Sequence, residues 1–132
     1  MDAAAHCKLT ILIVEDEWIV RLAIAALLQE AGYTVLEAET GEQALSHLAE
    51  NPPIDIVFTD IMLGGRLNGW DVAEAFRARY SELPIIYTSG YMTTPPRIVD
   101  GGIFFPKPYS PDQIIRACGR LTEHQFVGRE AQ

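Results

Sequence analysis

Acidic side chains follow two apolar runs of this chain, and a lysine lies between two prolines near its C-terminal part. Glu15 and Asp16 directly follow the first run and Asp60 follows the second, while the lysine is Lys107. The runs are residues 10–14 and 54–59. If both are strands of a parallel sheet, their carboxyl ends meet at the edge where such sheets bind ligands. Several carboxylates and one amine at that edge predict a divalent-cation and phosphoryl site.

Each of these residues also has a plain structural interpretation. Acids such as Glu15 and Asp16 are favoured at the N-terminus of a helix by its dipole, Asp60 is compatible with a loop, and Lys107 with a solvated surface. Together, in this order and at strand ends, they favour the functional interpretation. Two carboxylates about 4 Å apart repel by roughly 4 kcal/mol at an effective dielectric constant of 20, so such a cluster needs a cation.

Length and charge limit the classes of protein to which the chain can belong. Its 132 residues are enough for one domain. The net charge of −8, with no run of Lys or Arg, argues against nucleic acid as a partner. No apolar stretch approaches the roughly 20 residues of a membrane span, and the first residues lack the order of a signal peptide. We expect a cytoplasmic domain over residues 8–122, with flexible ends at 1–7 and 123–132.

Strand patterns alternate with helical patterns along the chain. The predicted strands are residues 10–14, 35–38, 54–59, 84–88 and 103–105. The predicted helices are residues 17–31, 40–50 and 69–79, and a last helix that begins after Ser110 with Pro111 in its first turn. This alternation predicts an α/β fold with a parallel sheet covered by helices on both sides.

One helix of the alternation is expected to be shortened or missing. Between Ser89 and Ile103 the chain contains the pair Pro95-Pro96 and the pair Gly101-Gly102. Proline breaks a helix interior, so the segment has room for only about one or two helical turns. We therefore predict that the fourth helix of the fold is stunted or absent.

From about Leu9 to Leu121 the chain resembles the receiver domain of response regulators, the CheY-like family. The resemblance lies in motif positions in a fixed order: an acidic pair ending the first strand, an aspartate ending the third, a Ser or Thr before a small residue after the fourth, and an aromatic residue three positions before Lys-Pro. Here these are Glu15-Asp16, Asp60, Ser89-Gly90 and Phe104 before Lys107-Pro108. The implied fold is flavodoxin-like and doubly wound, with five parallel strands in the order 2-1-3-4-5.

The resemblance implies a phosphorylatable switch in two-component or phosphorelay signalling. Asp60 would accept a phosphoryl group from a histidine kinase or a histidine phosphotransfer protein and form an acyl phosphate. Mg²⁺ (or Mn²⁺) would be bound directly by Asp16, Asp60 and the backbone carbonyl of Met62, and through water by Glu15. Lys107 would pair with a phosphoryl oxygen. The chemistry is positioning and charge neutralisation rather than turnover of an external substrate, so we do not expect an enzyme.

Two residues are implied as the switch, and the chain departs from the family around the site. Ser89, or Thr88 as the second candidate, would donate a hydrogen bond to the phosphoryl group, and Phe104 would move inward with it. A receiver usually has a proline soon after the aspartate and a glycine eight positions on, whereas here Gly69 lies at 69 − 60 = 9, so the loop is one residue longer. Bulky Met62 and Tyr91 flank the expected path of a hydrolytic water and predict slow self-dephosphorylation.

The first helix suggests a partner surface. Val20, Ala23, Ile24, Leu27 and Leu28 form one apolar stripe for the core. Trp18, Ile19, Leu22 and Ala26 add a second apolar run, and one stripe suffices to pack on a sheet. Because the family docks the kinase's helical bundle beside its active site, we expect Trp18, Ile19 and Leu22 to form a docking patch. The alternative is a wider buried face.

We interpret the chain as a stand-alone receiver, expected to be a monomer, whose output is binding to an unknown downstream protein or onward phosphotransfer. Two other functions would require different residues. A receiver that signals without phosphorylation would lack a site acid or the lysine, and all are present. A phosphatase with an aspartyl intermediate would need a second acid two residues after its nucleophile, where this chain has Met62.

Overall fold

The computed structural model describes residues 9–50, 52–90 and 97–131, with side chains up to residue 123. Five parallel strands form one sheet in the order β2-β1-β3-β4-β5. In chain order they are β1 Thr10–Val14, β2 Thr34–Ala38, β3 Ile56–Asp60, β4 Ile85–Ser89 and β5 Ile103–Pro106. The predicted strand order is confirmed. The third strand begins two residues later than predicted and includes Asp60 as its last residue.

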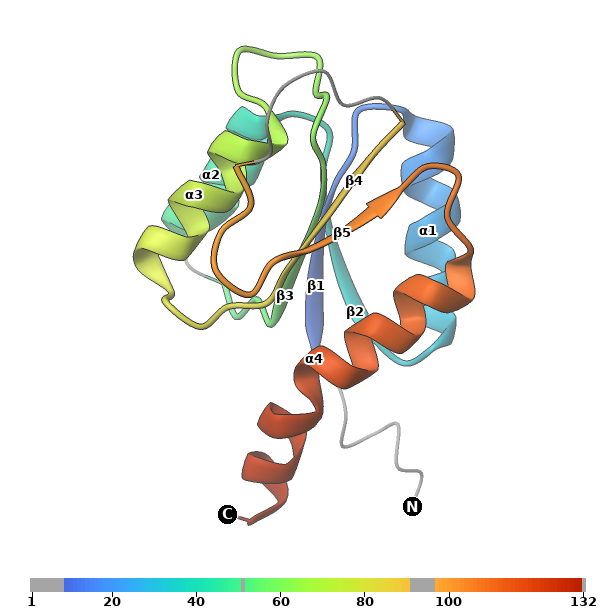
Figure 1. The fold of residues 1–132 in the computed structure, drawn as a ribbon, viewed down its shortest axis with the longest axis vertical. Coiled ribbons are helices and arrows are strands. Elements are labelled where there is room, and N and C mark those ends of the chain that lie inside the picture. The colour runs from blue at the N-terminus through green and yellow to red at the C-terminus, as the bar shows by residue number, and fades with distance from the viewer. Residues whose placement is uncertain (1–8, 51, 91–96, 132) are drawn as a thin grey trace.

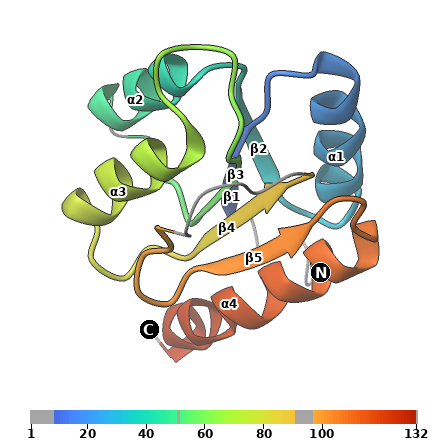
Figure 2. The ribbon, with the colours of Figure 1, turned by 45° about the horizontal axis from the view of Figure 1, so that its top comes forward.

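Helices cover both faces of the sheet (Figures 1 and 2). They are α1 Trp18–Glu30, α2 Gly41–Glu50, α3 Gly69–Arg79 and α4 Pro111–Ala131. Helices α2 and α3 lie on one face, and α1 and α4 lie on the other, so the sheet separates two cores. This is the doubly wound α/β fold that the sequence predicts.

The central strands are apolar on both faces, as a parallel sheet between two helix layers requires. Every residue of β1, β3 and β4 is buried. On the α2–α3 side, Trp70 of α3 packs beside Tyr87 of β4, and Phe76 of α3 belongs to the same core. On the α1–α4 side the core includes Leu28 of α1 and Cys118 of α4. With its middle fixed by packing, the sheet presents polar groups at the carboxyl ends of its strands.

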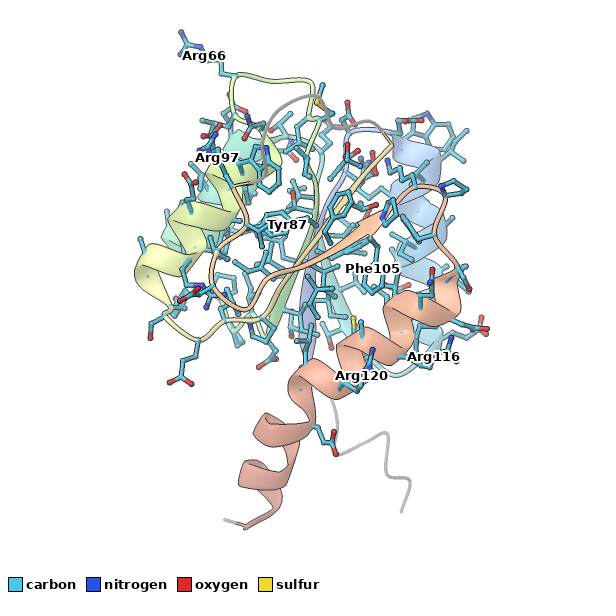
Figure 3. All side chains as sticks on the ribbon, in the orientation of Figure 1. Arg66, Tyr87, Arg97, Phe105, Arg116 and Arg120 are labelled. Atoms are coloured by element: carbon cyan, nitrogen blue, oxygen red, sulfur yellow. The ribbon has the colours of Figure 1, made fainter. Side chains whose placement is uncertain are left out.

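The connection between β4 and β5 contains no helix in its described part, residues 97–102. Instead, the backbone N–H of Val99 donates to the hydroxyl of the buried Tyr87 at 3.0 Å. The guanidinium of Arg97 bonds to the carboxylates of Glu74 and Asp71 on α3 at 2.7 and 3.2 Å. Figure 3 shows Arg97 beside this helix. The prediction of a shortened or missing fourth helix is confirmed for these residues; residues 91–96 lie outside the described part.

Helix α1 packs with a slightly different face from the one predicted. Its buried residues are Ile24, Ala25 and Leu28, whereas Ala23 is exposed. The inward stripe therefore runs through positions 21, 24, 25 and 28, at the spacing of three and four residues that one helix face requires. The predicted stripe was wrong in taking Ala23 in place of Ala25, and it passed over position 21 because arginine occupies it.

No helix in the described residues is long and apolar enough to cross a membrane. The domain limits given above, residues 8–122 with flexible ends, stay a prediction.

Candidate functional site

Asp60, Glu15 and Lys107 meet at the carboxyl edge of the sheet. The Nζ atom of Lys107, in the loop after β5, donates to Oδ2 of Asp60 at 3.0 Å and to Oε1 of Glu15 at 3.2 Å. Both carboxylates are buried, while Lys107 is partly exposed. The sequence separates Lys107 from Glu15 by 92 positions, and the parallel sheet brings their strand ends together. The lysine thus neutralises one of the two buried charges.

The electrostatics of Glu15 show that one lysine does not fully compensate the acids. The pKa of Glu15 is raised to about 7, chiefly by burial and also by the charge of Asp60, while the N–H of Glu17 and Lys107 act to lower it. Burial by itself lowers the pKa of Lys107, but hydrogen bonds and charges of Asp60 and Glu15 outweigh burial and raise it. Lys107 therefore stays protonated at neutral pH, while Glu15 is held close to its titration point.

Asp16 completes a cluster of three acids that fits a divalent cation. One carboxylate oxygen from each of Glu15, Asp16 and Asp60 lies within 4.8 Å of the others. If all three are ionised, Lys107 leaves two negative charges over. Oxygen donors with that excess charge are what Mg²⁺ and Mn²⁺ prefer. The donor set and its charge therefore fit such an ion.

A short contact at the base of the β3–α3 loop fixes the backbone at Asp60. The N–H of Gly69 donates to the carbonyl of Ile61 at 2.8 Å. A Cβ atom on Gly69 would overlap the carbonyl oxygen of Asp60 and lie 2.7 Å from the Cα of Ile61. The longer loop thus closes immediately behind the aspartate. The N–H of Met62 donates to Oδ1 of Asp60 at 3.2 Å, so both carboxylate oxygens accept a hydrogen bond.

The two candidates for the switch hydroxyl lie side by side at the end of β4. Ser89 and Thr88 are both buried. Thr88 lies opposite Asp60 in the sheet register, and its Oγ1 makes no hydrogen bond to any described residue. The carbonyl of Ser89 accepts from the N–H of Lys107 at 2.9 Å, which ties the strand end to the lysine loop. Phe104 is half-buried on the α2–α3 side of the sheet, in register with Tyr87.

The expected docking residues are exposed. Trp18, Ile19 and Leu22 on α1 are 60%, 66% and 49% accessible, so the alternative of a wider buried face is wrong for these side chains. The side chain of Met62, 62% accessible, is the large exposed apolar residue of the β3–α3 loop. The acidic edge is therefore accompanied by apolar surface from two elements.

Sequence reasoning missed two features that support the site, one arginine and one helix cap. Arg21 on α1 donates to the backbone carbonyl of Glu15, and Asn68 with Asp71 forms a capping box that starts α3 after the long loop. Asn before a helix with an acid three residues later is a recognisable signal for the cap. For Arg21 the available signal was a charged residue at a position of α1 that is three and four residues before buried apolar positions.

The fold and the acid cluster define a doubly wound α/β domain with a charged site at the carboxyl edge of its sheet. The sequence model described as response regulator receiver domain matches residues 11–118. The chain belongs to this family, and its role is that of a phosphorylatable receiver in two-component signalling.

Relatives and solved structures agree with this assignment. A response regulator receiver protein from Sinorhizobium medicae is 32% identical, with a TM-score of 0.84, over 89% of this chain and 96% of that one. A probable transcriptional regulatory protein of Picosynechococcus is 32% identical over 95% of this chain and 53% of its own length. Sensor kinase CckA of Brucella abortus is 33% identical over 88% of this chain and 13% of its own length. The chain thus spans about half or less of these curated relatives.

Proposed function

We propose that Asp60 accepts a phosphoryl group from a phosphohistidine of a sensor histidine kinase or a histidine phosphotransfer protein in the cytoplasm. The observation that carries the proposal is the Asp60 carboxylate itself. It is buried at a strand end, lies 3.0 Å from the Nζ of Lys107 and is grouped with two further acids. A carboxylate oxygen would attack phosphorus, the bond from phosphorus to the histidine nitrogen would break, and an acyl phosphate on Asp60 would result.

The chain's own residues would prepare this transfer. Asp16, Asp60 and the carbonyl of Met62 are proposed to bind Mg²⁺ or Mn²⁺ directly, with Glu15 acting through water. When bound, the ion neutralises charge on the carboxylates and on the phosphoryl oxygens. Lys107 would exchange its bond to Asp60 for one to a phosphoryl oxygen, which keeps its charge beside the transferred group.

Output would follow from the end of β4. We propose that the hydroxyl of Ser89 bonds to the phosphoryl group and that Phe104 moves inward with it, changing the face around β4 and β5. Because Ser89 and Lys107 are joined through the strand-end hydrogen bond, both would respond to one event. The downstream partner would be a protein that recognises this face. Thr88 remains the second candidate for the hydroxyl.

The exposed patch of Trp18, Ile19 and Leu22 is proposed as the docking surface for the helical bundle that carries the histidine. It lies at the start of α1, two to six positions after Asp16 in sequence. Leu22→Arg is expected to slow phosphotransfer from a cognate kinase at least tenfold while leaving the small-molecule reaction with acetyl phosphate unchanged. Equal rates from the kinase would remove the patch from the proposal.

We also propose slow self-dephosphorylation, because neither Met62 nor Tyr91 is an acid or amide that could orient water. Met62 is exposed beside Asp60, and Tyr91 lies outside the described residues. Met62→Asn combined with Tyr91→Glu is expected to shorten the lifetime of the acyl phosphate; an unchanged lifetime would reject this point.

The proposed function is tested by intact mass after incubation with acetyl phosphate. The wild type with Mg²⁺ should gain one phosphoryl group, and the gain should be lost in EDTA and in Asp60→Asn. Since this variant keeps the size of the side chain, its circular dichroism should match that of the wild type. If folded wild type gains no phosphoryl group from acetyl phosphate or phosphoramidate, the chain acts as a phosphorylation-independent binding domain instead.

A further inference from the structure

Arg21 occupies a position on α1 where an apolar residue is expected. It precedes Ile24 and Ala25 by three and four residues, which places it on the inward stripe of the helix. Only 14% of its side chain is accessible. A mostly buried guanidinium costs free energy unless its donors are satisfied, so its partners indicate why arginine is here.

Its partners are one backbone carbonyl of the site and one carboxylate of β2. Nη1 donates to the carbonyl oxygen of Glu15 at 2.8 Å, and Nε donates to Oε1 of Glu37 at 3.0 Å. Glu39, in the loop after β2, lies at 4.0 Å from Nη1. The fixed geometry of the guanidinium allows it to bond to both the carbonyl and the β2 carboxylate at once.

The bonded carbonyl belongs to the peptide group that joins Glu15 to Asp16. The N–H of Glu15 donates to Ala38 at 3.0 Å, and its carboxylate accepts from the N–H of Glu17 and from Lys107. Because Arg21 donates to the carbonyl of Glu15, every polar group of Glu15 has a hydrogen-bond partner. The Asp16 side chain, in contrast, makes no hydrogen bond with any described residue and is exposed. Its direction therefore depends on the backbone that Arg21 anchors.

We propose that Arg21 is a positioning residue for the metal ligands: by fixing the Glu15–Asp16 peptide group, it pre-orients both carboxylates for the divalent cation. This inference rests on the proposed function in one respect: both require a divalent cation at Glu15, Asp16 and Asp60. Groups outside the ligand set that orient it typically change metal affinity by about 10- to 100-fold when they are removed.

The sign of the effect separates positioning from simple charge. Arg21 is a cation close to a cation site, so through-space repulsion alone predicts that its removal tightens metal binding. Loss of positioning predicts the opposite. Glu37 and Glu39 provide a matched pair of variants. Neutralising either one removes one negative charge near Arg21, but only Glu37 accepts a hydrogen bond from the guanidinium, at 3.0 Å against 4.0 Å for Glu39.

The experiment measures Mn²⁺ binding at pH 8 without a phosphodonor. The free ion is quantified by its electron paramagnetic resonance signal, and competition with Mg²⁺ gives the affinity for that ion. Arg21→Met is expected to weaken binding about tenfold or more. Arg21→Lys, which keeps the charge but replaces the two bonding nitrogens of the planar guanidinium with one, should also bind more weakly than the wild type. Glu37→Gln should weaken binding about threefold relative to Glu39→Gln. With acetyl phosphate, Arg21→Met should need more Mg²⁺ for half-maximal rate yet approach the wild-type rate at saturation.

Wild-type affinity in a folded Arg21→Met, or tighter binding, would overturn the inference while leaving the proposed function intact. If that variant does not fold, as its circular dichroism in EDTA would show, the Glu37→Gln and Glu39→Gln pair decides, and equal affinities overturn the inference. Wild type that binds Mn²⁺ but gains no phosphoryl group would overturn the proposed function alone. Wild type that binds no Mn²⁺ at millimolar concentration would overturn both.

Discussion

Acids lie where β1 and β3 end at the same edge of the sheet, but the loops that follow these two strands are held in different ways. In the β1–α1 loop, Glu15 has a partner for every polar group, and one of these partners is Arg21. In the β3–α3 loop, residues 61–68, one hydrogen bond closes the base, where Gly69 donates to Ile61, and another holds one side, where the N–H of Arg66 donates to Oε2 of Glu42 at 3.2 Å.

The difference explains how the longer loop is compatible with a precise site. The extra residue lies beyond the closure at Ile61 and Gly69, so the added length does not displace Asp60. The side chain of Arg66 extends away from the body of the domain (Figure 3). In the first loop the polar groups of Glu15 are thus all held, whereas the second loop is held at its base and along one side.

The largest effect is expected from opening the base of the second loop. Gly69→Ala would place a Cβ atom against the carbonyl of Asp60 and the Cα of Ile61, backbone atoms that cannot rotate away. We expect the free energy of unfolding in urea to fall by at least about 3 kcal/mol. The matched control is Gly119→Ala in α4, where no atom lies within 4 Å of the added Cβ and a gain of about 1 kcal/mol is expected. Unchanged stability of Gly69→Ala would show that the loop base can shift without cost.

A smaller effect is expected from the buried acid of the first loop. The pKa of Glu15 is raised from 4.5 to about 7 in the folded protein, chiefly by burial. The folded state then binds more protons than the unfolded chain between these values, so stability in EDTA should fall as pH rises from about 4.5 to 7. At about 1.4 kcal/mol per pKa unit, the loss is about 3 kcal/mol at most.

Glu15→Gln should remove this pH dependence, and Glu17→Gln, an exposed neighbour, should keep it. Urea unfolding at pH 5 and pH 8 measures both. If the free energy of unfolding of Glu15→Gln changes with pH as much as that of the wild type, the buried Glu15 carboxyl does not cause the pH dependence.

The smallest effect is expected at the side contact of the second loop. Glu42→Ala removes the acceptor of the Arg66 amide. A hydrogen bond at an exposed site contributes about 1 kcal/mol, so exchange of this amide hydrogen should be roughly fivefold faster. The Asp71 amide, bonded to Asn68 at 3.0 Å, is the internal control and should be unchanged. Equal acceleration of both amides would mean that the loop moves as one unit with its cap.

Most of the fold could be predicted because its signals are local. Apolar runs, helical periodicity and caps act within about ten residues, and they predicted the alternation of strands and helices and the lack of a helix at residues 97–102. The order of the strands in the sheet was implied by the family resemblance. The inward face of α1 was harder to predict. Ala23 and Ala25 are equally apolar, and packing against the sheet, rather than residue type, decides which of them is buried.

The sequence by itself determined which acids and which lysine stand at the ends of strands, because strand patterns and their flanking residues are contiguous in the chain. Only the tertiary structure decided how their charges are balanced. Lys107 lies 47 positions from Asp60 and 92 from Glu15, and the guanidinium that holds the Glu15 carbonyl comes from the next helix. The packing of strands and helices determines which partners the buried polar groups have, and no local sequence pattern predicts those partners.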